Sequence, residues 1–232
     1  MTISANRTIA DPGTITTAVQ AVQAAIAAAD TAAKGVIYGP FSVQVAPASS
    51  FNQIWIGNIA FYQFTGSTGP WLPLGDVIGV PADNFAIPGG GVLCFAPDGD
   101  PAALAHPVGF RGVVGDQGSG NPNDVEYWWP VAPAGYTALG LCFNNSYDTP
   151  PDPANYWCVK TQYLQTVSNS VVWNDQGAGW DGDGTLFVPA FSATPETPPQ
   201  GNVLILPPTL LSGSDLGNEL PFALVGTLAT NA

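Results

Sequence analysis

The stretch Asp116-Gln-Gly-Ser-Gly-Asn-Pro-Asn-Asp124 recurs 59 residues further along the chain as Asp175-Gln-Gly-Ala-Gly-Trp-Asp-Gly-Asp183. Continued without a gap to Pro130 and Pro189, the alignment has identical residues at six of fifteen positions: Asp116, Gln117, Gly118, Gly120, Asp124 and Pro130. Random matching at average residue usage would give about one identity. We therefore infer an internal repeat, which is typical of folds built from similar units.

Each copy of the repeat predicts a strand, a glycine-rich turn and a second strand. An apolar run precedes each turn (Val113-Val114 and Val171-Val172-Trp173), and an aromatic or apolar run follows it (Tyr127-Trp-Trp and Leu186-Phe-Val). Such short β-branched and aromatic runs around glycine-rich turns are typical of hairpins.

A shorter signature, aromatic-x-x-[Leu/Val]-Gly, occurs three times, at Trp71–Gly75, Tyr136–Gly140 and Phe222–Gly226. Together with the longer repeat it predicts three related sheet units. A single hairpin cannot bury its own apolar face, so we expect the three units to share one core.

The composition favours many short strands over long helices. Hydrophobic residues make up 46% of the 232 residues, charged residues only 9%, and Gly (27) and Pro (23) are both frequent. Glycine and proline interrupt regular structure and mark turns, so this composition predicts an all-β fold with a substantial core.

Residues 14–34 are the exception, because their apolar positions Ile15, Val19, Val22 and Ile26 follow a helical period. We expect one N-terminal α-helix there. The predicted organisation is a helical appendage over residues 1–35, followed by a β domain over residues 36–232. The narrow apolar stripe would dock on a sheet or drive self-association of the chain.

The charge distribution excludes two classes of partner. The net charge is −13, and the only bases are Arg7, Lys34, Arg111 and Lys160. Four dispersed bases cannot form the cationic patch that nucleic acids or anionic membranes require. The sequence shows neither an apolar signal-peptide core nor an apolar run long enough for a transmembrane segment. We expect a cytoplasmic protein, or one secreted without a signal peptide.

Three motifs resemble those of the vacuolar protein sorting protein 62-like family of plants and fungi: Trp129-Pro130, Pro133-Ala-Gly-Tyr-Thr-Ala-Leu-Gly140 and Val172-Trp-Asn-Asp-Gln-Gly-Ala-Gly179. The resemblance covers roughly residues 51–191. It implies a β-prism-like domain with three pseudo-symmetric antiparallel sheets. Related domains occur at the ends of pore-forming toxins, where they are thought to bind target surfaces. The chain departs from this pattern in its N-terminal helix and in its first unit, which lacks an Asp-x-Gly-x-Gly turn.

The glycine-rich turns are the candidate ligand sites. Their simplest role is structural, with aspartate capping the turn. In the functional interpretation, carboxylates and exposed amides bind sugar hydroxyls and an aromatic face covers the sugar ring. Trp180 lies within a Gly/Asp turn, so we expect it to be exposed. The candidate ligand-binding residues are Asp116, Gly118, Ser119, Gly120, Asp124, Asp175, Gly177, Gly179, Trp180 and Asp183.

Metal ions and catalysis receive less support from the sequence. Asp175, Asp181 and Asp183 offer hard oxygen ligands suited to Ca²⁺, with turn capping as the alternative and no other cofactor expected. Cys94, Cys142 and Cys158 predict buried thiols, or one Cys142–Cys158 bridge. His106 is the only histidine, and no nucleophile elbow, P-loop or dinucleotide fingerprint is present. We therefore predict no enzymatic activity.

The sequence thus predicts a lectin-like protein that recognises glycans, or a glycosylated or membrane surface, in defence or recognition. The alternative is a component of a pore-forming or insecticidal toxin system that acts with a partner protein.

Overall fold

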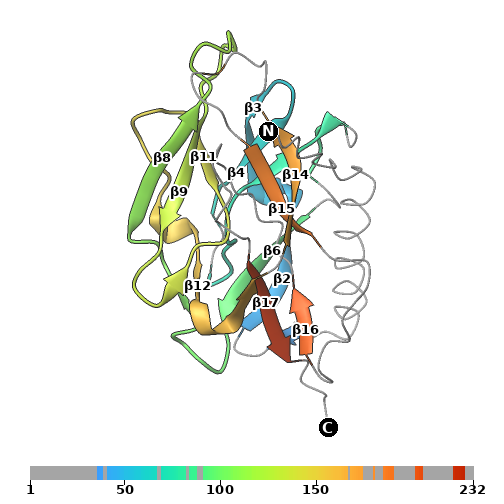
Figure 1. Cartoon of the computed structure of the whole chain (residues 1–232), viewed down its shortest axis with the longest axis vertical. Coiled ribbons are helices and arrows are strands. Elements are labelled where there is room, and N and C mark those ends of the chain that lie inside the picture. Colours follow the sequence, from blue (N-terminus) through green and yellow to red (C-terminus); the bar gives the residue numbers. More distant parts are fainter. Residues whose placement is uncertain are drawn as a thin grey trace, which may run out of the picture.

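A bulged β-hairpin occurs three times in the computed structural model of the chain (Figure 1). The first hairpin consists of β3 (Phe51–Ile56) and β4 (Ala60–Phe64), the second of β8 (Gly109–Gly115) and β9 (Glu126–Val131), and the third of β14 (Ser168–Asn174) and β15 (Thr185–Ala190). All three lie in the upper half of the view in Figure 1.

The three hairpins share one register. In each, the pairing shifts by one residue just before Trp55, Val114 or Trp173, and these residues pair with Phe61, Tyr127 and Leu186. Every pair of the second hairpin has its counterpart 59 residues further on in the third. The strand–turn–strand repeat is therefore confirmed, and it extends to the first unit. A bulge increases the local twist of a strand, so all three hairpins bend at the same point.

A third strand completes the first two of these sheets. β5 (Val77–Gly79) pairs with β4, and β11 (Cys142–Asn144) pairs with β9. In both units the glycine that ends the short aromatic signature lies two residues before this strand. A Cβ atom on Gly75 would lie 2.8 Å from Cα of Gly140, and the reverse also holds. The two units therefore meet backbone to backbone, at a distance that only glycine allows.

The third occurrence of this signature, Phe222–Gly226, has a different position. It lies in β17 (Phe222–Thr227), the central strand of its sheet. Its first two counterparts lie at sheet edges, where Leu72 bridges to Phe95 and Tyr136-Thr137 pairs with Lys160-Val159. The third occurrence therefore does not share the position of the first two, because a five-residue apolar pattern fits strands at different places in a sheet.

Three further antiparallel sheets fill the lower half of the molecule in Figure 1. They have the strand orders β1-β2-β6, β10-β12-β7 and β13-β17-β16. Their strands are β1 (Val36–Tyr38), β2 (Phe41–Pro47), β6 (Gly91–Pro97), β7 (Leu104–Ala105), β10 (Tyr136–Thr137), β12 (Cys158–Lys160), β13 (Leu164–Thr166), β16 (Asn202–Ile205) and β17.

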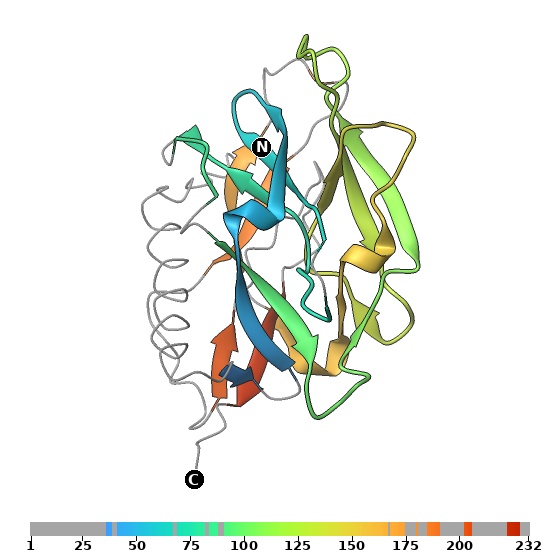
Figure 2. The same cartoon turned by 180° about the vertical axis from the view of Figure 1, so that it is seen from behind.

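The chain passes between the two halves within single units. Figure 2 shows β2 continuing upward through the 3-10 turn η1 (Ala48–Ser50) into β3. The other 3-10 turns, η4 (Pro153–Asn155) and η5 (Thr161–Tyr163), flank β12. The upper and lower sheets of a unit are therefore covalently continuous.

The core of the upper half lies where the three hairpins meet. Phe61 is fully buried, and its ring centroid lies 5.2 Å from that of Tyr127 and 4.7 Å from that of Phe143. Trp55 and Leu186 are buried in the same cluster. Each unit thus contributes large apolar side chains to one shared centre, as the sequence predicts.

The structure describes residues 36–38, 41–66, 69–81, 84–87, 91–166, 168–174, 180, 185–190, 202–205 and 222–227. Over these residues the fold is mostly β with antiparallel sheets, as predicted, and the helical segments with stated bounds are short 3-10 turns. No helix in the described part is long and apolar enough to cross a bilayer. The helix expected at residues 14–34, its self-association and the appendage over residues 1–35 lie outside the described residues and stay predictions.

Truncation of the central ring should destabilise the whole fold. Phe61→Ala removes the ring that contacts Tyr127 and Phe143, and we expect the free energy of unfolding to fall by about 3–5 kcal/mol. Ile56→Ala, on an exposed residue of the paired strand, should change it by less than about 0.5 kcal/mol. Urea unfolding followed by circular dichroism measures both changes. Equal losses in the two variants would contradict a shared core centred on Phe61.

Candidate functional site

The turn of the second hairpin is organised around the carboxylate of Asp116. This side chain is almost fully buried (2% exposed) and accepts four hydrogen bonds from protein donors. Two come from its own turn, where Val125 N donates to Oδ1 at 2.9 Å and Ser119 Oγ donates to Oδ2 at 3.0 Å. A carboxylate offers about four acceptor positions, so Asp116 is saturated by the protein itself.

The other two donors come from outside the turn. Trp55 Nε1, in the first unit, donates to Asp116 Oδ2 at 2.7 Å, and the hydroxyl of Tyr147 donates to Oδ1 at 2.7 Å. Asn121 Nδ2 adds a second link to the first unit by donating to the carbonyl of Ile56 at 2.7 Å. The turn therefore ties two units together, which supports the structural interpretation of Asp116.

Asp124 has a different environment, at the far end of the same turn. It is exposed, and its Oδ1 lies 3.0 Å from the hydroxyl of Tyr147, which also contacts Asp116. Partial burial and these two carboxylates raise the pKa of the Tyr147 hydroxyl well above its usual value, so it remains a neutral donor. The hydroxyl has one proton, which Asp116 and Asp124 share, and Asp124 Oδ2 is a second acceptor atom on the exposed side chain.

The remaining predicted residues of this turn lie at the surface. Gly118 and Gly120 are exposed and have φ angles of 86° and 76°, which allow the chain to reverse sharply. Ser119 is half-buried, and its hydroxyl is engaged with Asp116 while it accepts from Asn121 N at 3.1 Å. Of the five predicted ligand residues in this turn, Gly118, Gly120 and Asp124 are therefore the accessible ones.

Trp180 lies among aromatic rings, although we expected it to be exposed. It is half-buried, and its ring centroid lies 5.3 Å from those of Tyr127 and Trp173 and 5.8 Å from that of Trp55. This tryptophan of the third turn thus packs against all three units. Its contacts are those of a core residue that covers the centre of the upper half.

The other predicted residues of the third turn, Asp175, Gly177, Gly179, Asp181 and Asp183, lie outside the described residues. Their roles in binding a ligand or Ca²⁺ stay predictions. Within the described part of the chain, no group of three or more His, Cys, Asp or Glu side chains is placed to hold a metal ion.

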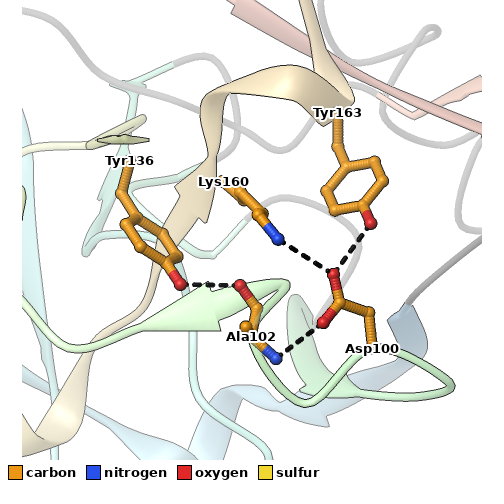
Figure 3. A network of polar contacts seen from close by, with 5 residues as sticks. All are labelled: Asp100, Ala102, Tyr136, Lys160 and Tyr163. Carbon is orange, nitrogen blue, oxygen red and sulfur yellow. Dashed lines mark hydrogen bonds and ion pairs between the residues drawn. The ribbon is translucent and has the colours of Figure 1, made fainter. Parts of the chain in front are cut away.

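A second polar cluster lies in the lower half of the molecule (Figure 3). Asp100 accepts from Ala102 N at 2.9 Å, from the Tyr163 hydroxyl at 2.9 Å and from Lys160 Nζ at 3.3 Å. These donors, first among them the backbone N–H of Ala102, lower the pKa of the Asp100 carboxyl. The hydroxyl of Tyr136 donates to the carbonyl of Ala102 and closes the network. The polar atoms of this network are hydrogen-bonded to one another, which is typical of a network that stabilises a loop.

The three cysteines and the histidine, which are the side chains considered for disulfide formation and catalysis, all lie in the described part of the chain. All three cysteines are free and buried, so the thiol interpretation is confirmed and Cys142 and Cys158 are not bridged. Burial raises the pKa of the Cys94 and Cys158 thiols to about 12. His106 is exposed, stacks on Trp157 at 4.1 Å between ring centroids, and contacts the carbonyl of Tyr156 through Nδ1.

Two partners of the turn were not identified from the sequence. Trp55 lies in a unit that lacks the Asp-x-Gly-x-Gly signature, and Tyr147 lies in an irregular loop after β11. The only signal for Trp55 was its position 59 residues before Val114 and 118 before Trp173, which becomes visible once the bulges align. Nothing in the local sequence marks Tyr147.

Comparisons with known proteins show a likeness of fold. No family model matches the chain, and no curated protein matches it. The crystal structure of GNIP1Aa from Chromobacterium piscinae superposes with a TM-score of 0.55 at 22% sequence identity. The match covers 76% of this chain and 33% of that chain, so this chain spans about a third of the length of GNIP1Aa. At this identity the likeness shows a shared fold and says nothing about activity.

Loss of the indole donor to Asp116 should loosen the contact between the first two units. Trp55→Phe keeps a ring but removes the Nε1–H, and we expect the free energy of unfolding to fall by about 1.5–3 kcal/mol, as for a hydrogen bond to a charged group. Trp157→Phe removes a donor to the neutral carbonyls of Pro70 and Phe95, so its hydrogen-bond loss should be about 1 kcal/mol. Chemical denaturation measures both, and a smaller loss for Trp55→Phe would contradict the assigned role.

Proposed function

We propose that the chain is a non-enzymatic, lectin-like binding module that recognises a neutral glycan on a free or membrane-bound glycoconjugate. The observation that carries the proposal is the exposed carboxylate of Asp124. The Tyr147 hydroxyl lies 3.0 Å from its Oδ1, and Gly118 and Gly120 of the same turn are also exposed. A fixed carboxylate accepts from sugar hydroxyls at a defined angle, and exposed turn amides can donate to them.

The buried part of the turn supports this role by making the exposed part rigid. Asp116 is held by four donors, and Asn121 anchors the turn to the first unit through Ile56. A preformed site loses little conformational entropy when a ligand binds. The buried hydrogen bonds hold the turn, and its exposed polar groups remain accessible. A weak, selective site for sugar hydroxyls needs this combination.

The charge of the binding face favours a neutral ligand. Asp124 and Asp148 are exposed there, and neither the turn 116–125 nor the loop 144–149 contains a base. Sialylated or sulfated glycans would meet like charge without a compensating cation, which costs affinity. Neutral hexoses and N-acetylhexosamines, which present hydroxyl donors, fit the face best.

The proposal extends to the architecture and the family of the chain. We propose that the three bulged hairpins and their lower sheets form a β-prism-like arrangement, as the resemblance to the vacuolar protein sorting protein 62-like family implies. The common register of the hairpins supports this architecture. The third turn has Asp175 and Asp183 at the repeat positions and would supply a second binding site, and Asp175, Asp181 and Asp183 would be the ligands of a Ca²⁺ ion there.

The alternative function is a component of a pore-forming or insecticidal toxin system. It is supported by the match to GNIP1Aa, because this fold there makes up about a third of a longer chain. A domain of that kind would act together with a partner protein. Glycan recognition is compatible with it, since a surface-binding domain needs a surface ligand.

Binding of neutral glycans is the decisive test of the proposal. On a glycan array probed with and without Ca²⁺, we expect neutral glycans to bind and sialylated ones not to bind. Asp124→Asn should weaken binding of the best ligand by about tenfold, the equivalent of one hydrogen bond to a charged group. Asp100→Asn, in the network of Figure 3, is the matched control and should bind like the parent protein.

Two results would contradict the glycan proposal. One is the absence of binding to every glycan under both conditions, and the other is equal loss of binding in the two aspartate variants. The toxin alternative has its own test, which is dye leakage from glycolipid-containing vesicles with candidate partner proteins added. Leakage without any glycan requirement would favour that alternative over the lectin-like role.

A further inference from the structure

A second buried carboxylate, that of Asp76, lies between the first and second units. Its side chain is fully buried, directly after the close contact between Gly75 and Gly140. Oδ1 accepts from Phe64 N in β4 at 2.8 Å, and Oδ2 accepts from Phe143 N in β11 at 2.7 Å. The carboxylate thus bridges the backbone of two units, away from the glycine-rich turn.

The third donor to Asp76 is a buried phenol. The hydroxyl of Tyr156 lies 3.0 Å from each carboxylate oxygen. Tyr156 belongs to the segment between η4 and β12, so a lower sheet joins the same junction. The partners of Asp76 are two amides and one hydroxyl, and none of them is a cation.

The two copies of the repeat differ at this position. Asp76 follows Gly75 as Leu141 follows Gly140, and Leu141 is fully buried in the apolar core. The equivalent position of the second unit therefore holds an apolar side chain. A buried charge without a counter-ion is unfavourable, so this one demands an explanation beyond packing.

The titratable groups that face Asp76 stay neutral over the ordinary pH range. They are the Tyr156 hydroxyl and the Cys142 thiol of β11, and burial raises the pKa of both well above their usual values. The carboxyl itself behaves differently. Burial raises the pKa of Asp76 to about 7, against smaller opposing effects of the Phe143 and Phe64 amides and the Tyr156 hydroxyl.

We propose that Asp76 is a proton-sensitive joint between the first and second units, whose carboxyl takes up one proton as the pH falls and then holds the units together more firmly. Protonation removes the buried negative charge. The new O–H donates to the Tyr156 oxygen, which lies 3.0 Å from both carboxyl oxygens, and each carboxyl oxygen keeps a lone pair for the amide of Phe64 or Phe143. The inference is independent of any glycan site.

The direction of the pH effect follows from the two states of the chain. In the unfolded chain Asp76 ionises near its ordinary pKa of 3.8, whereas in the folded chain it holds its proton up to about pH 7. Below both values the carboxyl is protonated in both states and contributes no pH dependence. Between them the unfolded state alone ionises, so folding becomes less favourable by roughly tenfold per pH unit. Above both values the full penalty remains.

Comparison of the parent protein with Asp76→Asn isolates this contribution. We expect the folding equilibrium constant of the parent, relative to the variant, to rise by roughly tenfold for each unit from about pH 7 down to about pH 5. The variant loses stability at every pH, because its amide N–H₂ must face the N–H of Phe64 or Phe143. The pH dependence of the ratio between the two folding equilibrium constants therefore reports the contribution of Asp76. A ratio that does not change with pH would overturn the proposal.

Two further measurements keep the proposal testable if Asp76→Asn fails to fold. Asp76→Leu copies the residue at position 141 and should likewise lack the pH-dependent contribution. In the parent protein, NMR titration of the Asp76 carboxyl carbon should have its midpoint near pH 7, and Tyr156→Phe should move that midpoint upward because a donor to the carboxylate is lost. A carboxyl that titrates near 3.8, its ordinary value, would overturn the proposal.

Discussion

The structure depends on the meeting of three bulged hairpins at one aromatic centre. An isolated two-stranded hairpin is at best marginally stable, so each hairpin depends on packing against the others. Phe61 and Tyr127 come from two different hairpins and Trp180 from the connection of the third, and their rings lie in contact. Because the bulges fall at the same place, each hairpin bends toward this centre in the same way. The sheets below are then joined to it by chain continuity.

The sequence predicted the fold through spacing. The 59-residue repeat aligns the second and third hairpins pair for pair, and the short signature places Gly75 and Gly140 at equivalent positions. The 59-residue alignment did not extend to the first hairpin, because its connection has three residues where that of the second has ten. The signature at Phe222 was misleading, since apolar alternation alone does not distinguish an edge strand from a central one.

Site prediction succeeded in part, for physical reasons. Glycine-rich sequence predicts a turn, and Gly118 and Gly120 have the positive φ angles that such a turn requires. The sequence did not predict that Asp116 is buried and structural while Asp124 is exposed. That difference depends on Trp55 and Tyr147, which reach the turn from elsewhere in the fold. Trp180 was expected to face solvent because its neighbours are Gly and Asp. It packs inward, against Trp55, Tyr127 and Trp173 from the three hairpins.

The bond between Trp55 and Asp116 has a consequence for the history of such a molecule. A residue of one copy donates a hydrogen bond to the turn of the next copy. Loss or replacement of either copy alone would therefore leave a buried polar atom without its hydrogen-bond partner. Val114, which occupies the position of Trp55 in the second copy, has no side-chain N–H to donate, so the copies differ in the contacts that they make with their neighbours. The repeated hairpins are therefore not independent of one another, and residues on the two sides of such a bond must change together.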